Sequence, residues 1–219
     1  GSEPLGGLAR YIQQNNYPPR IRGTLRDAVT YLWLELLADS SLWSPVESNE
    51  VFELDTEALI EGDLAVSSSV NLGDSGVHPL VKIGALLDDL EGWHVDGERS
   101  EAALEARLER LRRLHGALDT PDDRLTIRRH LVQVQNRFDR GFDWWSMWQS
   151  TLAEFSRSES SAVALVRARE AALAGRERHP GSIGGRRCDN IVASIEAPEY
   201  GLAAMATDGA GRRSLQITH

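Results

Sequence analysis

Aspartate residues at the ends of predicted elements are the residues of this sequence that could do chemistry. Asp55 ends a run of alternating apolar and polar residues, Asp189 begins a predicted helix, and Asp208 ends a predicted strand. Carboxylates that gather at one place repel one another, and they stay ionised together only when a cation binds them. Their hard oxygen atoms suit Mg²⁺ or Mn²⁺, and such an ion polarises a phosphodiester and lowers the pKa of a bound water.

The C-terminal stretch 189–208 carries its residues in a specific order. An acidic residue is followed by a helix of small residues, a Tyr-Gly turn and a short apolar strand that ends in Thr207 and Asp208. The two aspartates are 19 positions apart. In this order and spacing the stretch resembles the C-terminal half of the PIN-like nucleases. The resemblance implies that Asp189, Thr207 and Asp208 contribute to a metal-binding acidic pocket.

An upstream segment resembles the opening strand of the same family. Asp55 and Thr56 match the residues that end that strand, whereas Glu57 stands where asparagine or serine is usual. A second predicted strand leads through 66–70 to Asp74. The resemblance puts Asp74 in the position of the family's second acid.

The function that this resemblance implies is a metal-dependent ribonuclease, active or degenerate, with RNA as its partner and Mg²⁺ or Mn²⁺ as its cofactor. The predicted catalytic and metal-binding residues are Asp55, Asp189 and Asp208, with Asp74 as a further metal ligand. Arg186 and Arg187 stand next to Asp189 in the sequence. Guanidinium groups bind phosphate well, so these arginines and Thr207 are predicted to bind the substrate.

Each of these residues also has an ordinary structural interpretation. An aspartate at a helix start stabilises the helix through capping and the helix dipole, so Asp189 could be structural. Asp208 stands beside Gly209, a pair typical of turns, and Asp55 could face solvent at a strand end. The glycine-rich stretch 179–187 lacks the lysine of a phosphate-binding loop, and a flexible linker is its more ordinary interpretation.

A cluster of tryptophans favours an alternative function without catalysis. Trp144, Trp145 and Trp148 fall within five positions, and on a helix the first and the last share one face. This face could bind a protein partner or a nucleic-acid base. The interpretation that we favour is a core patch that meets Trp33 and Trp43.

The run Leu25–Ala38 predicts a helix that is apolar on most of its sides. Thr24 is a suitable N-cap, and Asp27 follows three residues later as in a capping box. A helix of this kind belongs in a core or at an interface. The alternative function is therefore a non-enzymatic helical protein–protein interaction module, which binds a partner through the Trp144–Trp148 face or through this helix.

The periodicity predicts a fold in which helices dominate. Apolar residues recur at helical spacing in 7–16, 25–38, 79–90, 98–118, 122–138, 142–155, 160–174 and 189–198. Short strands are predicted at 51–55, 64–70 and 202–206. We expect one α/β domain over residues 1–219 with a small central, mainly parallel sheet. An N-terminal helical segment (1–45) precedes the sheet and a large helical insertion (78–175) interrupts it. The alternative is an all-α fold.

The composition of the 219 residues is that of an ordinary globular protein. Hydrophobic residues make up 41% and charged residues 26%, and the mean hydropathy is −0.34. No stretch approaches the roughly 18 apolar residues that span a bilayer, so we expect a soluble protein with no membrane partner. The single cysteine, Cys188, favours the reducing cytoplasm. A net charge of −9 argues against broad, phosphate-driven binding of nucleic acid.

Overall fold

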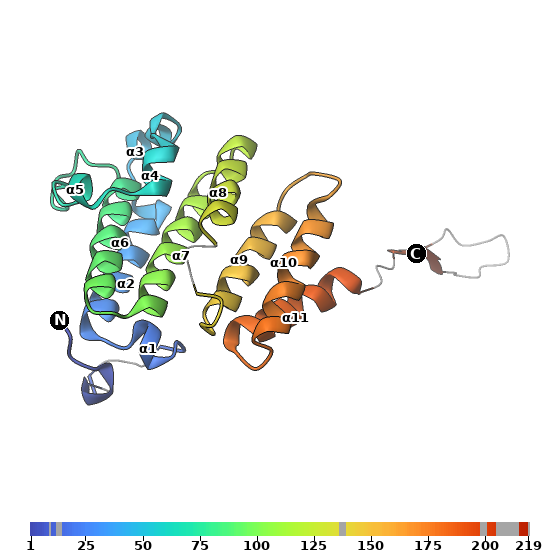
Figure 1. Cartoon of the computed structure of the whole chain (residues 1–219). Helices are drawn as coiled ribbons and strands as arrows, with labels where there is room; N and C mark the ends of the chain where they lie inside the picture. Colours follow the sequence, from blue (N-terminus) through green and yellow to red (C-terminus); the bar gives the residue numbers. More distant parts are fainter. Residues whose placement is uncertain (9, 12–14, 136–138, 198–200, 205–214, 219) are drawn as a thin grey trace.

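The computed structural model describes residues 1–8, 10–11, 15–135, 139–197, 201–204 and 215–218. In these residues the chain forms an array of helices and one two-stranded hairpin near the C-terminus (Figure 1). The longer helices are α2 (Leu25–Ala38), α6 (Pro79–Asp96), α7 (Ser100–Ala117), α8 (Pro121–Val134), α9 (Trp145–Arg157), α10 (Ala164–Arg178) and α11 (Ile183–Glu196). The short helical segments are η1 (Leu5–Leu8), α1 (Pro19–Arg22), η2 (Ser40–Leu42), α3 (Pro45–Glu50), η3 (Val51–Glu53), α4 (Thr56–Glu61) and α5 (Leu64–Ser67). The strands are β1 (Gly201–Ala204) and β2 (Leu215–Thr218).

Two of the three predicted strands are short helical segments instead. The stretch 51–55 contains η3 and the residue that caps α4, and the stretch 64–70 contains α5. Asp55 starts α4 because its carboxylate accepts a hydrogen bond from the Ala58 backbone at 3.0 Å. Alternation of apolar and polar residues over so few positions fits a helical turn as well as a strand.

The third predicted strand exists, but it belongs to a hairpin. Gly201–Ala204 pairs with Leu215–Thr218 in an antiparallel register. The described residues contain no further sheet, so the predicted α/β fold with a central parallel sheet is wrong and the all-α alternative is confirmed. The helices of the predicted insertion, 78–175, are consequently the body of the molecule.

The antiparallel pair α6 and α7 forms the core of the N-terminal part. The apolar spacing expected over 98–118 appears in α7 as a stripe of leucines, and α6 faces it with apolar residues at the same spacing. The fully buried members of the two stripes are Ile83, Leu87, Leu90, Leu104, Leu108 and Leu111. Helix α2 packs against α6, while α4 and α8 pack against α7. None of the helices in the described residues is long and apolar enough to cross a membrane.

The C-terminal part is a close packing of α9, α10 and α11 (Figure 1). Small residues permit the close approach. A Cβ atom on Gly184 of α11 would lie 2.2 Å from the Met147 backbone nitrogen, and one on Gly175 of α10 would lie 2.5 Å from the Cys188 sulfur. These glycines are required because any side chain would separate the helices.

Helix α11 begins earlier than the sequence predicts. Ser182 caps it by accepting a hydrogen bond from the Gly185 backbone at 2.9 Å, so the predicted loop 179–187 contains its first turn. Asp189 therefore lies within the helix and does not open it. Helix α10 likewise continues past the predicted stop at Gly175, because packing on α9 compensates for the low helix propensity of glycine.

Candidate functional site

The described aspartates of the predicted metal site lie in ordinary structural settings. Asp55 is the N-cap of α4. Asp74 is exposed in the loop before α6, where its carboxylate accepts a hydrogen bond from the backbone two residues later at 2.8 Å. Asp189 is exposed on α11, with its Oδ1 3.4 Å from the Arg176 guanidinium. These settings differ from the structural alternatives, since Asp55 caps a helix and does not end a strand, and Asp189 lies inside α11 and does not open it.

The fold does not bring these carboxylates together. The elements that carry Asp55 and Asp189 lie at opposite ends of the helix array in Figure 1. In the described residues no group of three or more acidic, histidine or cysteine side chains could hold a metal ion. Asp208 and Thr207 lie outside the described residues, so the ribonuclease and its Mg²⁺ or Mn²⁺ site stay a prediction.

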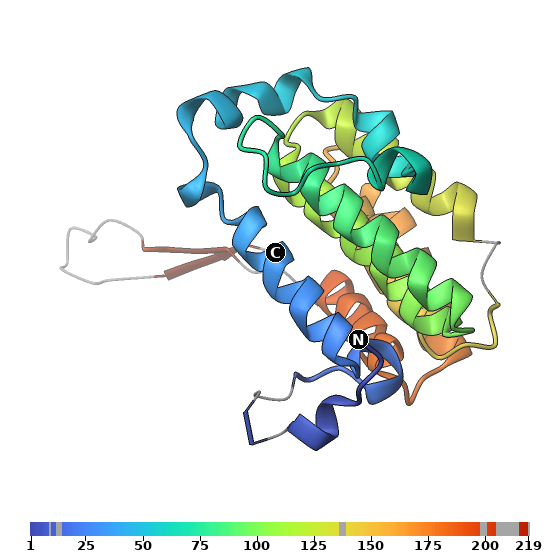
Figure 2. The ribbon, with the colours of Figure 1, turned by 90° about the vertical axis from the view of Figure 1, so that its left-hand side faces the viewer.

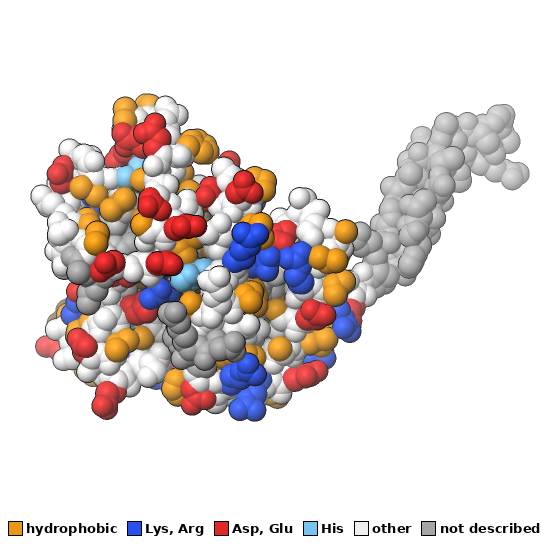
Figure 3. Space-filling model, turned by 45° about the horizontal axis from the view of Figure 1, so that its top comes forward, with side chains coloured by type: hydrophobic (Ala, Val, Ile, Leu, Met, Phe, Trp, Pro, Cys, Tyr) orange, Lys and Arg blue, Asp and Glu red, His pale blue; other side chains and the backbone are white. Residues whose placement is uncertain are grey.

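The arginines that were predicted to bind RNA contact the protein itself. Arg186 donates a hydrogen bond to the Gly181 carbonyl at 2.7 Å, and the Arg187 guanidinium lies 3.3 Å from the Met147 sulfur. On the face shown in Figure 3, acidic side chains are scattered over the N-terminal part, and basic side chains are more frequent toward the C-terminal helices. Several arginines of α8 and α10 form ion pairs, namely Arg128 and Arg167 with Glu159, Arg169 with Glu196, and Arg176 with Asp189.

The tryptophan cluster is part of the core, as the favoured interpretation predicts. Trp144, Trp145 and Trp148 are 2%, 6% and 0% exposed. Trp144 also donates a hydrogen bond from Nε1 to the buried Glu105 carboxylate of α7 at 2.6 Å. The predicted partner-binding face at Trp144–Trp148 is therefore wrong, because the molecule's own helices cover it. Trp33 does not join this cluster, since half of its surface is exposed.

Helix α2 has two apolar faces, and the protein covers only one of them. The capping box predicted at its start is present, with Thr24 and Asp27 bonded to each other's backbone. The inner face packs on the body of the molecule through residues three or four positions apart. Its buried residues are Asp27, Thr30, Tyr31 and Leu34.

The outer face of α2 carries four large apolar side chains in contact with solvent. They stand at positions i, i+3, i+4 and i+7, which place them in one stripe along a helix. The stripe consists of Val29, Leu32, Trp33 and Leu36, which are 48%, 64%, 51% and 55% exposed. Figure 2 shows α2 along the outside of the molecule, with no other helix over its outer side. We call these four residues the α2 stripe.

Buried polar contacts fix α2 in place. His94 of α6 contacts Asp27 through Nε2 at 2.9 Å and Arg99 Nε through Nδ1 at 3.0 Å. Because an arginine can only donate, Nδ1 accepts and the ring proton lies on Nε2, where it is donated to Asp27. Burial alone would raise the pKa of Asp27, but the hydrogen bonds from His94 and Thr24 lower it. Both nitrogens of His94 are used, so the pair anchors α2 and is not free to act as a base.

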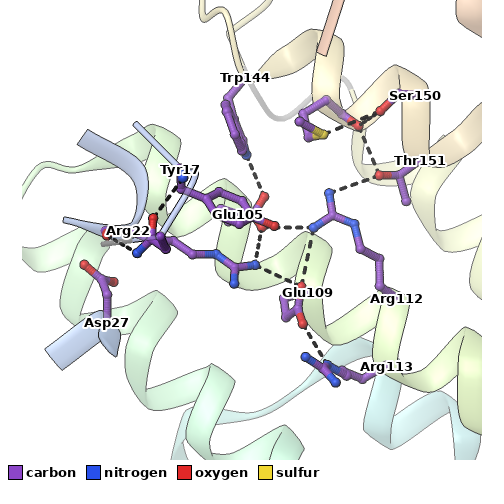
Figure 4. A network of polar contacts seen from close by, with 12 residues as sticks. Tyr17, Arg22, Asp27, Glu105, Glu109, Arg112, Arg113, Trp144, Ser150 and Thr151 are labelled. Atoms are coloured by element: carbon purple, nitrogen blue, oxygen red, sulfur yellow. Dashed lines mark hydrogen bonds and ion pairs between the residues drawn. The ribbon is translucent and has the colours of Figure 1, made fainter. Parts of the chain in front are cut away.

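A larger charged cluster fixes the segment that enters α2 (Figure 4). Arg22, the last residue of α1, bonds Glu105 at 2.6 Å and Glu109 at 3.0 Å through Nη2. Its guanidinium lies between two rings, 3.8 Å from the centroid of Tyr17 and 3.4 Å from that of Tyr31. Burial alone would lower the pKa of Arg22, but the surrounding tyrosines and glutamates raise it, so the side chain stays charged.

The same cluster joins the N-terminal and C-terminal parts. Arg112 bonds Glu105 at 2.9 Å and the Thr151 hydroxyl of α9 at 3.2 Å, and Arg113 bonds Glu109 at 2.7 Å (Figure 4). Burial alone would lower the pKa of Arg112, but the two glutamates raise it. Glu109, Arg112 and Arg113 line a cleft of about 520 Å³ at the end of α2. Since the arginines are already paired with carboxylates, we assign the cluster to structure and not to ligand binding.

The one cysteine has no properties of a nucleophile. Cys188 is fully buried between α9, α10 and α11, and its sulfur lies 3.4 Å from the Ser146 carbonyl oxygen. Burial raises the pKa of the thiol to about 12. A thiol that stays protonated at physiological pH is unreactive, so Cys188 is not a candidate catalytic residue.

Comparison with protein-family models, with curated proteins and with solved structures finds no match for this chain.

Proposed function

We propose that this protein is a non-enzymatic helical interaction module that binds a protein partner through the outer face of α2. The single observation that carries the proposal is the α2 stripe, in which four large apolar side chains are each about half exposed. Large apolar groups exposed together mark an interaction surface in folded proteins. A stripe at i, i+3, i+4 and i+7 is also the pattern by which a helix enters a groove on its partner.

The energetics favour a reversible contact. Complete burial of a large apolar side chain contributes roughly 1.5–3 kcal/mol, so each half-exposed member of the α2 stripe still has about 1 kcal/mol to gain. Four such side chains contribute a few kcal/mol before the costs of association. This amount supports a transient partner better than a permanent one.

The packing of the inner face of α2 on the rest of the protein increases the affinity with which the α2 stripe can bind a partner. The helix is held along its inner face by Asp27, Tyr31 and Leu34, which are 1%, 8% and 0% exposed. A binding helix that is already folded and fixed loses little conformational entropy when its partner binds. This is the role that we assign to the buried pair of Asp27 and His94.

Site-specific photo-crosslinking tests the proposal. Leu32 is replaced by the photo-reactive amino acid benzoylphenylalanine in the full protein, and the cells that produce the protein are irradiated. The same replacement at Leu165, which is 53% exposed on α10, is the matched control. We expect a crosslinked product at position 32 that is absent from the control and is lost when Trp33→Asp is added. Equal or no crosslinking at the two positions contradicts the proposal.

A further inference from the structure

We infer that the partner of the α2 stripe is a second copy of this chain, bound antiparallel about a two-fold axis between Leu32 and Trp33. This inference rests on the proposed function, since it names the partner of the same surface. Its basis is that the sequence of α2 is complementary to itself in one register, both in its apolar residues and in its charges.

The apolar residues match when the two helices run in opposite directions. In this register Leu32 of one copy faces the partner's Trp33, and Val29 faces the partner's Leu36. The two-fold axis repeats both contacts, so every member of the α2 stripe has an apolar partner. A contact of this isologous kind closes on itself and forms a dimer and not a fibre.

The charges at the two ends of the stripe match in the same register. Arg26 lies three residues before Val29, and Asp39 lies three residues after Leu36, so each Arg26 faces the partner's Asp39. Asp39 is exposed and uses only Oδ1 to cap η2. Arg26 holds Asp89 at 2.5 Å and keeps 30% of its side chain exposed. A parallel pairing would instead bring Arg26 of one copy toward the partner's Arg26, and these like charges would repel each other.

Helix dipoles favour the same arrangement. An antiparallel pair brings the positive N-terminus of each helix toward the negative C-terminus of the other. The 14 residues of α2 span about 21 Å, so an interface confined to this helix pair is below the standard size of about 1,600 Å². We therefore expect a weak dimer, with a dissociation constant on the order of 100 μM.

Sedimentation equilibrium of the full chain tests whether the dimer exists. We expect a reversible monomer–dimer equilibrium between about 10 and 500 μM, and at least a tenfold rise in the dissociation constant for Leu32→Asp. The control Leu165→Asp should leave the constant unchanged. A wild-type protein that stays monomeric at the highest concentration, or an equal effect of the two substitutions, would overturn the inference.

Charge reversal tests the polar part of the register. Arg26→Asp and Asp39→Arg each put like charges across the interface, so each alone should weaken the dimer. The double variant restores opposite charges and should recover most of the wild-type affinity. Circular dichroism should show that each variant keeps its helices. A double variant that dimerises more weakly than both single variants would contradict the register.

Engineered disulfides test the register directly. Oxidation of a mixture of Val29→Cys and Leu36→Cys chains should join one variant to the other. Two Val29→Cys chains should not join, because equivalent residues are offset by about 10 Å along the paired helices. Cys188 is fully buried and does not interfere. Joining of Val29→Cys chains to each other would show a parallel pair and contradict the inference.

The crosslink at position 32 distinguishes a failure of the proposed interaction surface from a failure of the second copy as its partner. A product between two copies of this chain supports both the interaction surface and the second copy. A product with a different protein keeps the interaction surface and overturns the second copy. No product at position 32 overturns both.

Discussion

At the scale of single residues, buried charges hold this molecule together. Glu105 is fully buried and bonds Arg22, Arg112 and Trp144. Removal of one partner from such a cluster leaves the remaining charges uncompensated in a poorly solvated place. The cluster therefore costs much more to break than an ion pair on the surface.

Substitution of Glu105 tests this role. We expect Glu105→Ala to lower the free energy of unfolding by about 3–5 kcal/mol, because Arg22 and Arg112 lose their shared carboxylate. The control Glu196→Ala breaks an exposed pair with Arg169 and should cost less than about 1 kcal/mol. Urea unfolding at pH 7 measures both. Similar losses for the two variants would show that the buried cluster contributes little.

The surroundings of His115 predict how the stability of the protein depends on pH. The His115 ring stacks on Phe155 with 3.9 Å between centroids, and burial lowers its pKa from 6.5 to about 4. The unfolded chain binds this proton more readily than the folded one, so the free energy of unfolding decreases as the pH falls from about 6.5 toward 4.

The effect of His115 is measured by difference. We expect the wild type to lose about 1 kcal/mol more than His115→Gln between pH 7 and pH 4.5, a figure kept small because the ring is half-buried and solvent screens it. Urea unfolding of both proteins at the two pH values gives this difference. Identical losses would contradict the assignment of the lowered pKa to His115.

At the scale of elements, glycine positions decide how closely helices approach. Gly184 of α11 lies against the backbone of α9, whereas Gly116 near the end of α7 has open space where its side chain would be. We expect Gly184→Ala to destabilise the protein by about 2–3 kcal/mol, since backbone atoms must move apart. Gly116→Ala should stabilise it by about 0.5–1 kcal/mol through helix propensity. Thermal unfolding measures both, and a stabilising Gly184→Ala would contradict the packing.

Several elements could be predicted because their local signals agree. Thr24 with Asp27 marks the start of α2 as predicted. Thr120 with Pro121 gives the same kind of local signal at the start of α8. The strand at 51–55 was predicted wrongly because helical caps at Ser44 and Asp55 compete with short-range alternation. The start of α11 was missed because its glycines indicate a loop until the close contact with α9 is known.

At the scale of the whole molecule, the sequence indicates that α2 is a core or interface helix but does not indicate which of its faces is exposed. The apolar character of Leu25–Ala38 predicted a core or interface helix, and the structure shows that its inner face serves the core and leaves the α2 stripe exposed. Period alone does not distinguish the two faces of a helix that is apolar all round. The spacing of Asp55 and Asp189 could not show that the fold carries them to opposite ends, since that depends on the topology.

The tryptophans differ in the same way, because some are buried in the core and one is exposed on α2. Trp144 contacts Glu105 of α7 from the start of α9, and Trp148 is fully buried in the same core. Trp33 lies on α2 and remains half exposed. The largest apolar side chain that the described residues offer to a partner is therefore on α2 and not on α9.

The most direct test of this account compares two leucines of the same helix, two residues apart. Leu34 is fully buried and Leu32 is 64% exposed. At a protein concentration of about 1 μM, well below the expected dissociation constant, urea unfolding of Leu34→Ala should show a loss of about 2–5 kcal/mol. Leu32→Ala should change the free energy of unfolding by less than about 0.5 kcal/mol. Equal losses would contradict the account, because they would show that the outer face of α2 is covered within a single chain and is not free to bind a partner.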